Sequence, residues 1–327
     1  MHQLMRMKKG KVLLTRKLHD FALKELRKHY SIEVHSGKIP MPKRKLLEKI
    51  KDKDGLICFP YDNIDKQVID SAKKLRAIST FSVGYDQIDV KYAKKRKIRI
   101  GYTPEVLTDA TADLTFSLIL DLLRQVTDGD RIIRNGEWRQ IFGAYDYVGT
   151  DLSGKILGIL GMGRIGRAVA KRAIPFGMKI IYHNRKRLPR KIESMTHSKF
   201  ESLNQLLKKS DIISVHVPYT KQTHQLVDMK FLKKMKKSSF LVNSARGGII
   251  KEKDLISALK RKIIAGAALD VFENEPIGKN HPFVKMYNVV IAPHIGSSTL
   301  ETRKKMAELT VKNLELALSG KKPIYSV

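Results

Sequence analysis

The sequence predicts an α/β fold with mostly parallel sheets, on the strength of three observations. Apolar strand patterns alternate with helical patterns from one end of the chain to the other. The length of 327 residues favours about two domains. Near the middle of the chain, a glycine-rich turn joins a buried strand to a helix, which is typical of parallel α/β sheets.

The composition supports a folded protein and limits the chemistry it can use. Hydrophobic residues make up 42% of the chain, enough for a sizeable core. Cys58 is the only cysteine, which excludes an internal disulfide and a multi-cysteine metal site, and we expect no bound metal. No apolar run reaches the length of a membrane span, and no apolar segment follows the basic N-terminus. We therefore expect a soluble cytoplasmic protein.

The charge is strongly positive. Lysine and arginine number 64 against 32 acidic residues, a formal net charge of +32, which would attract anionic substrates and polyanions. The basic residues are dispersed in many short runs without interleaved aromatics, so nucleic acid is not an expected partner. Acidic residues are too scarce for the ion-pair surface of a thermophile. A solvated, lysine-biased surface is the favoured interpretation.

The first hundred residues contain the elements of one parallel sheet. Apolar patterns predict strands at residues 11–15, 55–59, 75–80 and 98–101, and helical spacing predicts helices at 20–29, 43–51 and 65–73. Thr103 and Pro104 then interrupt regular structure. Leu114, Leu118, Leu122 and Val126 recur every four residues and predict one long helix over 108–134, ended by Asn135 and Gly136.

The glycine-rich turn follows a predicted strand at 156–160. Gly161 permits the tight turn, Gly163 leaves room for a pyrophosphate at the backbone, and Gly166 lets the next helix pack closely on the strand. That helix is expected over 165–176, where Gly177 closes it. Its N-terminus favours an anion, so the sequence predicts a Rossmann-like, doubly wound nucleotide-binding domain.

Further strands are predicted at residues 179–182, 212–217, 240–243, 266–271 and 289–292, before a final helix at 300–318. Ligands of open parallel sheets bind beyond the carboxyl ends of the strands. We therefore expect the following residues to gather on one rim: His216, Ser244, Ala245, Arg246, Asp270 and His294.

The cofactor preference is predicted from the end of the second strand after the turn. NAD-binding proteins carry a carboxylate there that bonds the ribose hydroxyls. This chain has Asn184, followed by Arg185, Lys186 and Arg187, which can accommodate a 2′-phosphate. The sequence therefore predicts a preference for NADP(H), with NAD(H) still possible if the cations belong only to the basic surface.

Three residues of the predicted rim suit the reduction of a 2-oxoacid. Arg246 can grip a carboxylate and polarise the adjacent carbonyl. His294, as an imidazolium, can give a proton to the carbonyl oxygen while hydride arrives from the cofactor. Glu275 can bond the other ring nitrogen and keep His294 protonated. Any one of these residues alone would be interpreted as a surface or core group; together they predict a catalytic set.

The sequence resembles the D-isomer-specific 2-hydroxyacid dehydrogenases over nearly its whole length, and within them the glyoxylate and hydroxypyruvate reductases. The motifs that carry this resemblance lie at residues 82–89, 108–113, 161–166, 216–218, 243–248, 266–276 and 293–297. It implies Arg246, Glu275 and His294 as catalytic residues, and Val83, Gly84 and Arg246 as substrate-binding residues. Cofactor contacts are implied at Gly161, Gly163, Arg164, Ile165, Gly166, Asn184, Arg185, Lys186, Val217, Pro218, Ser244, Ala245, Arg246, Asp270 and His294.

The resemblance also implies an organisation. A flavodoxin-like substrate domain would comprise residues 1–103 and 296–327, and the nucleotide-binding domain 104–295, with closure at Thr103-Pro104 and near Pro293. It implies a homodimer formed through the nucleotide-binding domains. Trp138 resembles an aromatic that subgroup members offer to the neighbouring active site, and packing at the dimer interface is its alternative role.

The expected function is therefore reduction of a small 2-oxoacid, glyoxylate or hydroxypyruvate, to the D-2-hydroxyacid, with His294 as proton donor. Two alternatives stay open. One is phosphoglycerate or D-lactate dehydrogenase specificity. The other is a co-repressor-like binding protein that senses NAD(P), which the basic charge favours and the complete set of Arg246, Glu275 and His294 opposes.

Overall fold

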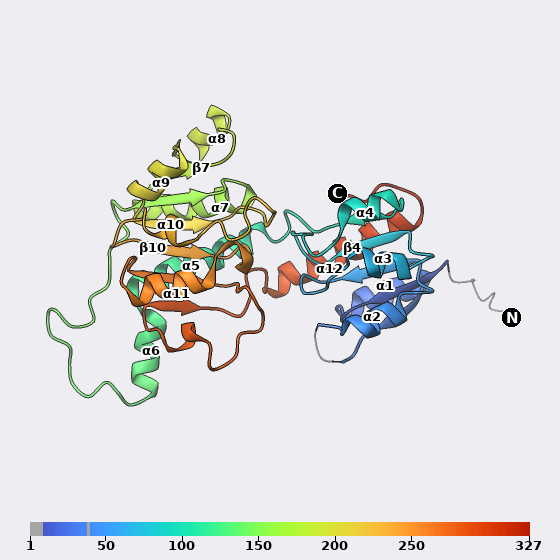
Figure 1. Cartoon of the computed structure of the whole chain (residues 1–327), viewed down its shortest axis with the longest axis horizontal. Helices are drawn as coiled ribbons and strands as arrows, with labels where there is room; N and C mark the ends of the chain where they lie inside the picture. Colours follow the sequence, from blue (N-terminus) through green and yellow to red (C-terminus); the bar gives the residue numbers. More distant parts are fainter. Residues whose placement is uncertain (1–8, 38–39) are drawn as a thin grey trace. The chain divides into compact units, whose positions relative to one another are not determined.

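The computed structural model describes residues 9–37 and 40–327. The chain divides into two compact units, of which the first comprises residues 1–107 and 298–327 and the second residues 108–297. Each unit is built on one sheet whose paired strands are all parallel, as the alternating strand and helix patterns predict (Figure 1). In the described residues no helix is long and apolar enough to span a membrane.

The first unit contains a five-stranded sheet in the order β2-β1-β3-β4-β5, the flavodoxin-like order. Its strands are β1 (Lys11–Leu14), β2 (Ser31–Val34), β3 (Gly55–Cys58), β4 (Ala77–Thr80) and β5 (Arg99–Gly101). Its helices are α1 (Asp20–His29), α2 (Lys43–Lys49), α3 (Lys66–Ser71), α4 (Val90–Lys95) and α12 (Leu300–Leu318). The central strands β3 and β4 are buried throughout, which is why they carry no charged side chain on either face.

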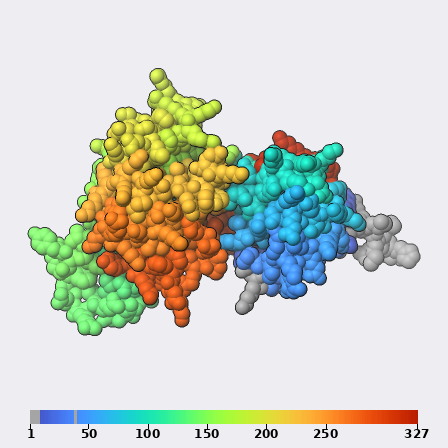
Figure 2. Space-filling model, in the orientation of Figure 1, coloured from blue at the N-terminus to red at the C-terminus, as the bar shows by residue number. Residues whose placement is uncertain are grey.

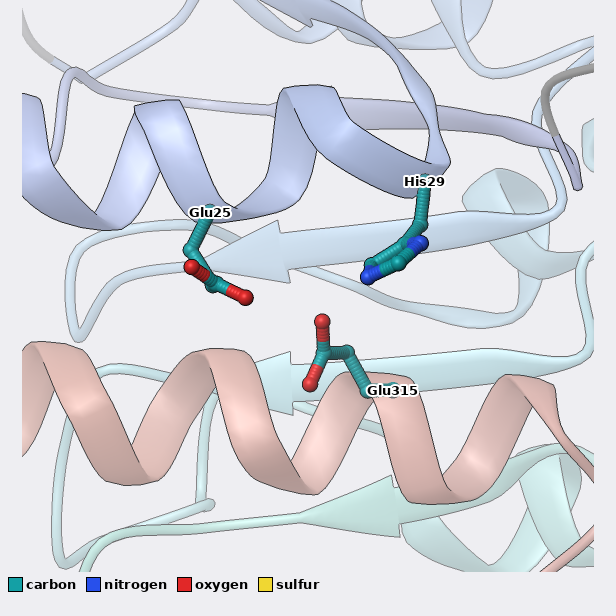
Figure 3. A group of neighbouring side chains, drawn as sticks. All are labelled: Glu25, His29 and Glu315. Atoms are coloured by element: carbon teal, nitrogen blue, oxygen red, sulfur yellow. The ribbon is translucent and has the colours of Figure 1, made fainter. Parts of the chain in front are cut away.

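Helix α12, at the end of the chain, completes the first unit. It packs against β3, β4 and β5 and contacts α1. Glu25 and His29, one turn apart on α1, face Glu315 of α12, with their oxygen and nitrogen atoms within 4.8 Å of one another (Figure 3). Partial burial raises the pKa of Glu315, while His29 and Lys312 favour its charged form. Two carboxylates and one imidazole therefore meet where α1 packs against α12.

The second unit contains a seven-stranded sheet in the order β12-β11-β10-β9-β6-β7-β8. Its strands are β6 (Ile156–Leu160), β7 (Lys179–His183), β8 (Ser198–Phe200), β9 (Ile212–Val215), β10 (Phe240–Asn243), β11 (Gly266–Leu269) and β12 (Val289–Ile291). The strand order reverses at β6, between β7 and β9, and this is the switch point where doubly wound sheets bind ligands.

Helices cover both faces of this sheet. The helices of the second unit are α5 (Thr108–Arg124), α6 (Val126–Arg134), α7 (Arg164–Ala173), α8 (Arg190–Met195), α9 (Leu203–Lys209), α10 (Met229–Leu232) and α11 (Glu252–Lys260), with short 3-10 turns at Ile174–Phe176, Gly247–Ile249 and Pro282–Lys285. Neighbouring strand residues join opposite core clusters: Leu241 packs with α9, α10 and α11, and Val242 with α5 and α7. This period of two is the expected pattern of a sheet buried on both faces.

The single helix expected over 108–134 is wrong, because it breaks at Gln125. This residue has a φ of 57°, in the left-handed region, and separates α5 from α6. The carboxylate of Asp121 accepts the N–H of Thr127 at 2.7 Å and its hydroxyl at 2.5 Å, so a side chain takes over a bond that the helix would need. Val126 consequently leaves the buried stripe and is 64% exposed.

Helix α6 and the segment that follows it, residues 126–150, form an arm that projects from the second unit (Figures 1 and 2). No residue of α6 is buried. The arm carries exposed apolar side chains at Val126, Ile133, Trp138, Ile141, Phe142, Tyr145 and Val148. Such a density of exposed apolar surface marks an interaction surface.

Candidate active site

The glycine-rich turn links β6 to α7, and its three glycines meet different constraints. Gly161 has a φ of +101°, and a Cβ there would lie 2.7 Å from the backbone of His216 and Val217. A Cβ on Gly166 would lie 2.5 Å from the Gly161 oxygen. Gly163 differs, because no atom lies within 4 Å of a Cβ at that position. The backbone of Gly163 is thus open to a bound group, whereas the other two glycines are required by the fold.

The beginning of α7 fits a dinucleotide pyrophosphate. Gly163 is the N-cap residue and provides no side-chain cap, and Arg164 and Ile165 form the first turn. The first N–H groups of a helix have no partner within it and attract anions. The cradle that a Cβ on Gly163 would fill therefore suits the phosphates of NAD(P), at the switch point of the sheet.

The basic residues that follow β7 differ in whether a carboxylate of the protein binds them. Asn184 accepts the N–H of Met162 at 2.7 Å through its Oδ1, so it braces the glycine-rich turn. Arg185 and Lys186 are exposed and have no ion-pair partner in the described part of the chain. Arg187 is also predicted to accommodate the 2′-phosphate, but its guanidinium binds both carboxylate oxygens of Glu193, at 2.9 and 2.8 Å.

Glu193 binds the guanidinium of Arg187 as part of a small hydrogen-bond network. Arg187 and the hydroxyl of Tyr182, at 2.7 Å, both bind its carboxylate and lower its pKa to about 2. The same Tyr182 oxygen accepts the N–H of Leu188 at 2.8 Å. The Arg187 guanidinium is thus part of the structure that shapes the loop after β7, and two of the three predicted cations remain for a phosphate.

The predicted rim residues follow neighbouring strands at the carboxyl edge of the sheet. Val217 and Pro218 come after β9, Ser244, Ala245 and Arg246 after β10, Asp270 and Glu275 after β11, and His294 after β12. His216 stands at the same edge, where its Nε2 lies 2.8 Å from the hydroxyl of Ser214 and burial lowers its pKa to about 4. His216 is therefore neutral at physiological pH.

Asn243, the last residue of β10, shapes the loop that carries Arg246. Its amide nitrogen donates to the Arg246 oxygen at 2.9 Å, and its Oδ1 accepts the N–H of Ala245 at 3.0 Å. Ser244 is fixed separately, with its hydroxyl 2.6 Å from that of Thr115 on α5. Asn243 is fully buried. The sequence alone does not predict this role of Asn243. The one feature that could indicate it is a polar amide at the end of a buried strand.

Glu275 and His294 form a direct pair. The Glu275 Oε2 and His294 Nδ1 atoms lie 2.6 Å apart, with side-chain exposures of 16% and 22%. The other carboxylate oxygen of Glu275 accepts the N–H of Phe272 at 2.9 Å. Both oxygens are therefore used, and the carboxylate is fixed on one nitrogen of the imidazole, as general acid catalysis by the other nitrogen requires.

Asp270 and Gly247 connect these loops. The Asp270 carboxylate accepts the N–H groups of Ile295 and Gly296 at 2.7 and 2.8 Å, next to His294. Burial raises the pKa of Asp270, and the two N–H donors and His294 act in the opposite direction. A Cβ on Gly247 would lie 1.9 Å from the backbone of Phe272, so only glycine lets the Arg246 loop lie against the segment that leads to Glu275.

Val83 and Gly84 lie in the first unit, in the loop after β4. Gly84 is partly exposed, and Val83 lies next to it in the same loop. Within the described residues, the N–H groups of Val83 and Gly84 donate no hydrogen bond. Two adjacent N–H groups without an acceptor are available to an anion such as a carboxylate.

Known proteins resemble this chain over most of its length. The family described as "D-isomer specific 2-hydroxyacid dehydrogenase, NAD binding domain" matches residues 116–296. The glyoxylate reductase of Thermofilum pendens is 46% identical, over 97% of this chain and 94% of that protein. Among solved structures, a protein from Thermus thermophilus matches with a TM-score of 0.90 and 43% identity, over 97% of this chain and 99% of that one. An NADPH-dependent glyoxylate/hydroxypyruvate reductase from Sinorhizobium meliloti, solved with NADP and malonate, matches with a TM-score of 0.86 and 28% identity, over 98% and 97%.

Proposed function

Since the chain belongs to the D-isomer specific 2-hydroxyacid dehydrogenase family, we propose that it reduces a small 2-oxoacid, glyoxylate or hydroxypyruvate, to the 2-hydroxyacid. The observation that carries the proposal is the contact of Glu275 with His294, 2.6 Å apart, beside the loop of Arg246. An acid–imidazole pair suits proton delivery to a carbonyl, and the loop after the neighbouring strand β10 carries Arg246, whose Nη1 donates to the Ala245 oxygen at 2.8 Å.

Each residue has a distinct task. We assign the substrate carboxylate to the N–H groups of Val83 and Gly84. We assign to the guanidinium of Arg246 the binding of an anionic substrate and the polarisation of its carbonyl. Because Glu275 binds Nδ1 of His294, Nε2 delivers the proton to the carbonyl oxygen. The bound reduced nicotinamide supplies the hydride. After transfer, His294 takes up a proton from solvent, while the Glu275 carboxylate stays on Nδ1.

We further propose that NADP(H) is preferred over NAD(H), which the protein can still use. The exposed cations Arg185 and Lys186 support this, because they follow β7 without a carboxylate between them and the glycine-rich turn. The N-terminus of α7 holds the pyrophosphate, and loops after β9, β10 and β11 hold the remainder of the dinucleotide. Residues 108–297 then act as the nucleotide-binding unit and the remaining residues as the substrate unit.

We also propose a homodimer in which the arm of residues 126–150 contacts the second copy. Its support is the exposed apolar surface, in which Ile141 is 89% and Tyr145 94% exposed. Trp138, which is also exposed and packs against Phe142 at 6.4 Å between ring centroids, belongs to the same surface.

One experiment tests the activity. NADPH oxidation is followed with glyoxylate, hydroxypyruvate, pyruvate and 3-phosphohydroxypyruvate, and the series is repeated with NADH. We expect the highest kcat/KM with glyoxylate or hydroxypyruvate and NADPH. A gel shift at physiological salt is measured in parallel; salt-resistant DNA binding without turnover of any 2-oxoacid would instead support the co-repressor-like alternative that the net charge of +32 suggests.

A further inference from the structure

The loop of residues 81–87 has an unusual way of keeping its shape. In the described chain, backbone hydrogen bonds join other residues of the loop to neighbouring segments, but the N–H groups of Val83 and Gly84 donate none. Backbone bonds therefore do not fix the directions of these two N–H groups. Two N–H groups grip a carboxylate well only if their directions are fixed before the substrate arrives, because ordering them on binding would cost affinity. A device that fixes the loop is therefore expected.

Side chains supply this device as a directed chain of hydrogen bonds. The amide nitrogen of Gln87 lies 2.8 Å from the hydroxyl of Thr80, which lies 2.8 Å from that of Ser82, which lies 2.5 Å from the carbonyl oxygen of Gly84. The carbonyl can only accept, so Ser82 donates to it. Each hydroxyl has one proton, so Thr80 donates to Ser82, and Gln87 must donate to Thr80.

The chain of bonds is anchored to the sheet. Thr80 is the last residue of β4 and, like Ser82, is buried. The main-chain oxygen of Ser82 accepts the N–H of Thr103 at 2.9 Å, and that of Gln87 accepts the N–H of Ile64 at 2.8 Å. The position of the Gly84 carbonyl is thus linked to the rigid end of a central strand.

The second observation concerns Gln87. Its Oε1 atom is buried and has no hydrogen-bond partner among the described residues. A buried acceptor without a partner is unfavourable, and an apolar side chain of the same length would avoid that cost. The unpaired oxygen therefore indicates that the amide nitrogen is needed as the hydrogen-bond donor to Thr80.

We propose that Gln87, Thr80 and Ser82 are positioning residues that fix the carboxylate grip of Val83 and Gly84 before the substrate binds. The inference rests on the proposed function, because that function assigns the carboxylate to these N–H groups. The three side chains touch neither the reacting carbonyl nor the cofactor. They therefore affect substrate and transition state equally, which raises KM and leaves kcat unchanged when they are lost.

The test uses near-isosteric variants of the full-length protein. Thr80→Val, Ser82→Ala and Gln87→Met each remove one link, and Ser79→Ala is the matched control, because Ser79 lies on the same strand and its hydroxyl donates to Thr310 at 2.8 Å instead. KM and kcat are measured with glyoxylate, and the Kd of oxalate is measured by calorimetry on the NADP-loaded protein. We expect KM and Kd to rise about five- to tenfold in the three variants, and kcat to stay within about twofold.

Two further variants test whether the hydrogen bonds of Gln87, Thr80 and Ser82 act together. The double variant Thr80→Val with Ser82→Ala should be no worse than Ser82→Ala alone, because Thr80 acts on the Gly84 oxygen through Ser82. Thr80→Ser, which keeps the hydroxyl, should restore KM to within about twofold of the original value and also covers the case in which Thr80→Val fails to fold.

The outcomes separate the two proposals. Unchanged KM and oxalate affinity in variants that only melt earlier, or additive effects in the double variant, would overturn the positioning role. If the unmodified protein turns over no 2-oxoacid, the proposed function fails instead, and the oxalate titration still reports whether the three residues control a carboxylate site.

Discussion

Asp270 holds the backbone at His294 from two sides. Its main-chain oxygen accepts the N–H of His294 at 2.9 Å, and its carboxylate accepts the next two N–H groups along the chain. His294 has a φ of 55°, in the left-handed region that favours glycine, so this conformation needs such support. The imidazole that meets Glu275 is therefore positioned by a buried carboxylate as well as by the residue it pairs with.

The pair of Glu275 and His294 predicts a loss of turnover. In Glu275→Gln an amide replaces the carboxylate that orients the imidazole through Nδ1, so kcat with glyoxylate should fall about a hundredfold, while the Kd of NADPH stays within about twofold. Steady-state kinetics and a cofactor titration measure the two quantities. An unchanged kcat would contradict the role of Glu275, whereas an equal loss of NADPH affinity would indicate damage to the fold.

The glycine-rich turn predicts contrasting effects for two alanine substitutions. Gly163→Ala should leave the melting temperature unchanged, because nothing in the protein lies within 4 Å of the new Cβ, but the Kd of NADPH should rise about tenfold or more. Gly161→Ala should lower the free energy of unfolding by about 2 kcal/mol or more, since its φ of +101° and the backbone of His216 both oppose a side chain. Equal cofactor affinity in Gly163→Ala and the unmodified protein would place the pyrophosphate elsewhere.

The loop after β7 predicts which cation recognises the 2′-phosphate. Arg185→Ala should lower kcat/KM with NADPH about tenfold and leave that with NADH nearly unchanged, because only the phosphate contact is lost. Arg187→Ala is the matched control: it leaves Glu193 without its bidentate partner, so it should lower the melting temperature and keep the ratio of NADPH to NADH activity. If Arg187→Ala instead lowered the ratio of NADPH to NADH activity and Arg185→Ala did not, Arg187 would be the residue that binds the 2′-phosphate.

The exposed arm predicts self-association. Ile141→Asp combined with Tyr145→Asp should weaken the dimer roughly a hundredfold, because it introduces two charges into an apolar contact. Sedimentation over a range of protein concentrations measures the dissociation constant. Tyr287→Asp is the control, since Tyr287 is 80% exposed but lies outside the arm. Dimers of equal strength in all three proteins would exclude the arm from the interface.

The sequence predicts the two parallel sheets well, because buried strands such as β3 and β11 are continuous apolar runs. It does not predict the edge strands β2 and β8, which are short and only partly buried. It also misses the break at Gln125, because the apolar spacing continues from Leu122 to Val126 while a polar contact ends the helix.

In the candidate site, too, the sequence predicts some contacts and not others. The contact of Glu275 with His294 follows from side-chain chemistry at the ends of neighbouring strands, and the structure contains it, although the catalytic roles of both residues stay predictions. The bonds that shape the loops, from Asn243 and Gln87, join residues through turns with no periodic pattern. Nothing in the linear sequence therefore distinguishes these two amides from surface ones.

His216 predicts a pH-dependent stability. Burial lowers its pKa in the folded protein to about 4, whereas the pKa of a histidine in the unfolded chain lies near 6.5. Below about pH 6.5 the unfolded chain therefore binds a proton that the folded protein refuses, and stability falls by about 1.4 kcal/mol per pH unit until about pH 4. In His216→Gln this contribution is absent, and the amide can still bond Ser214. Urea unfolding of the cofactor-free protein at pH 7, 6 and 5 should show a smaller decrease for the variant, by about 2 kcal/mol at pH 5. Parallel decreases in both proteins would mean that His216 is protonated in the folded state as readily as in the unfolded one.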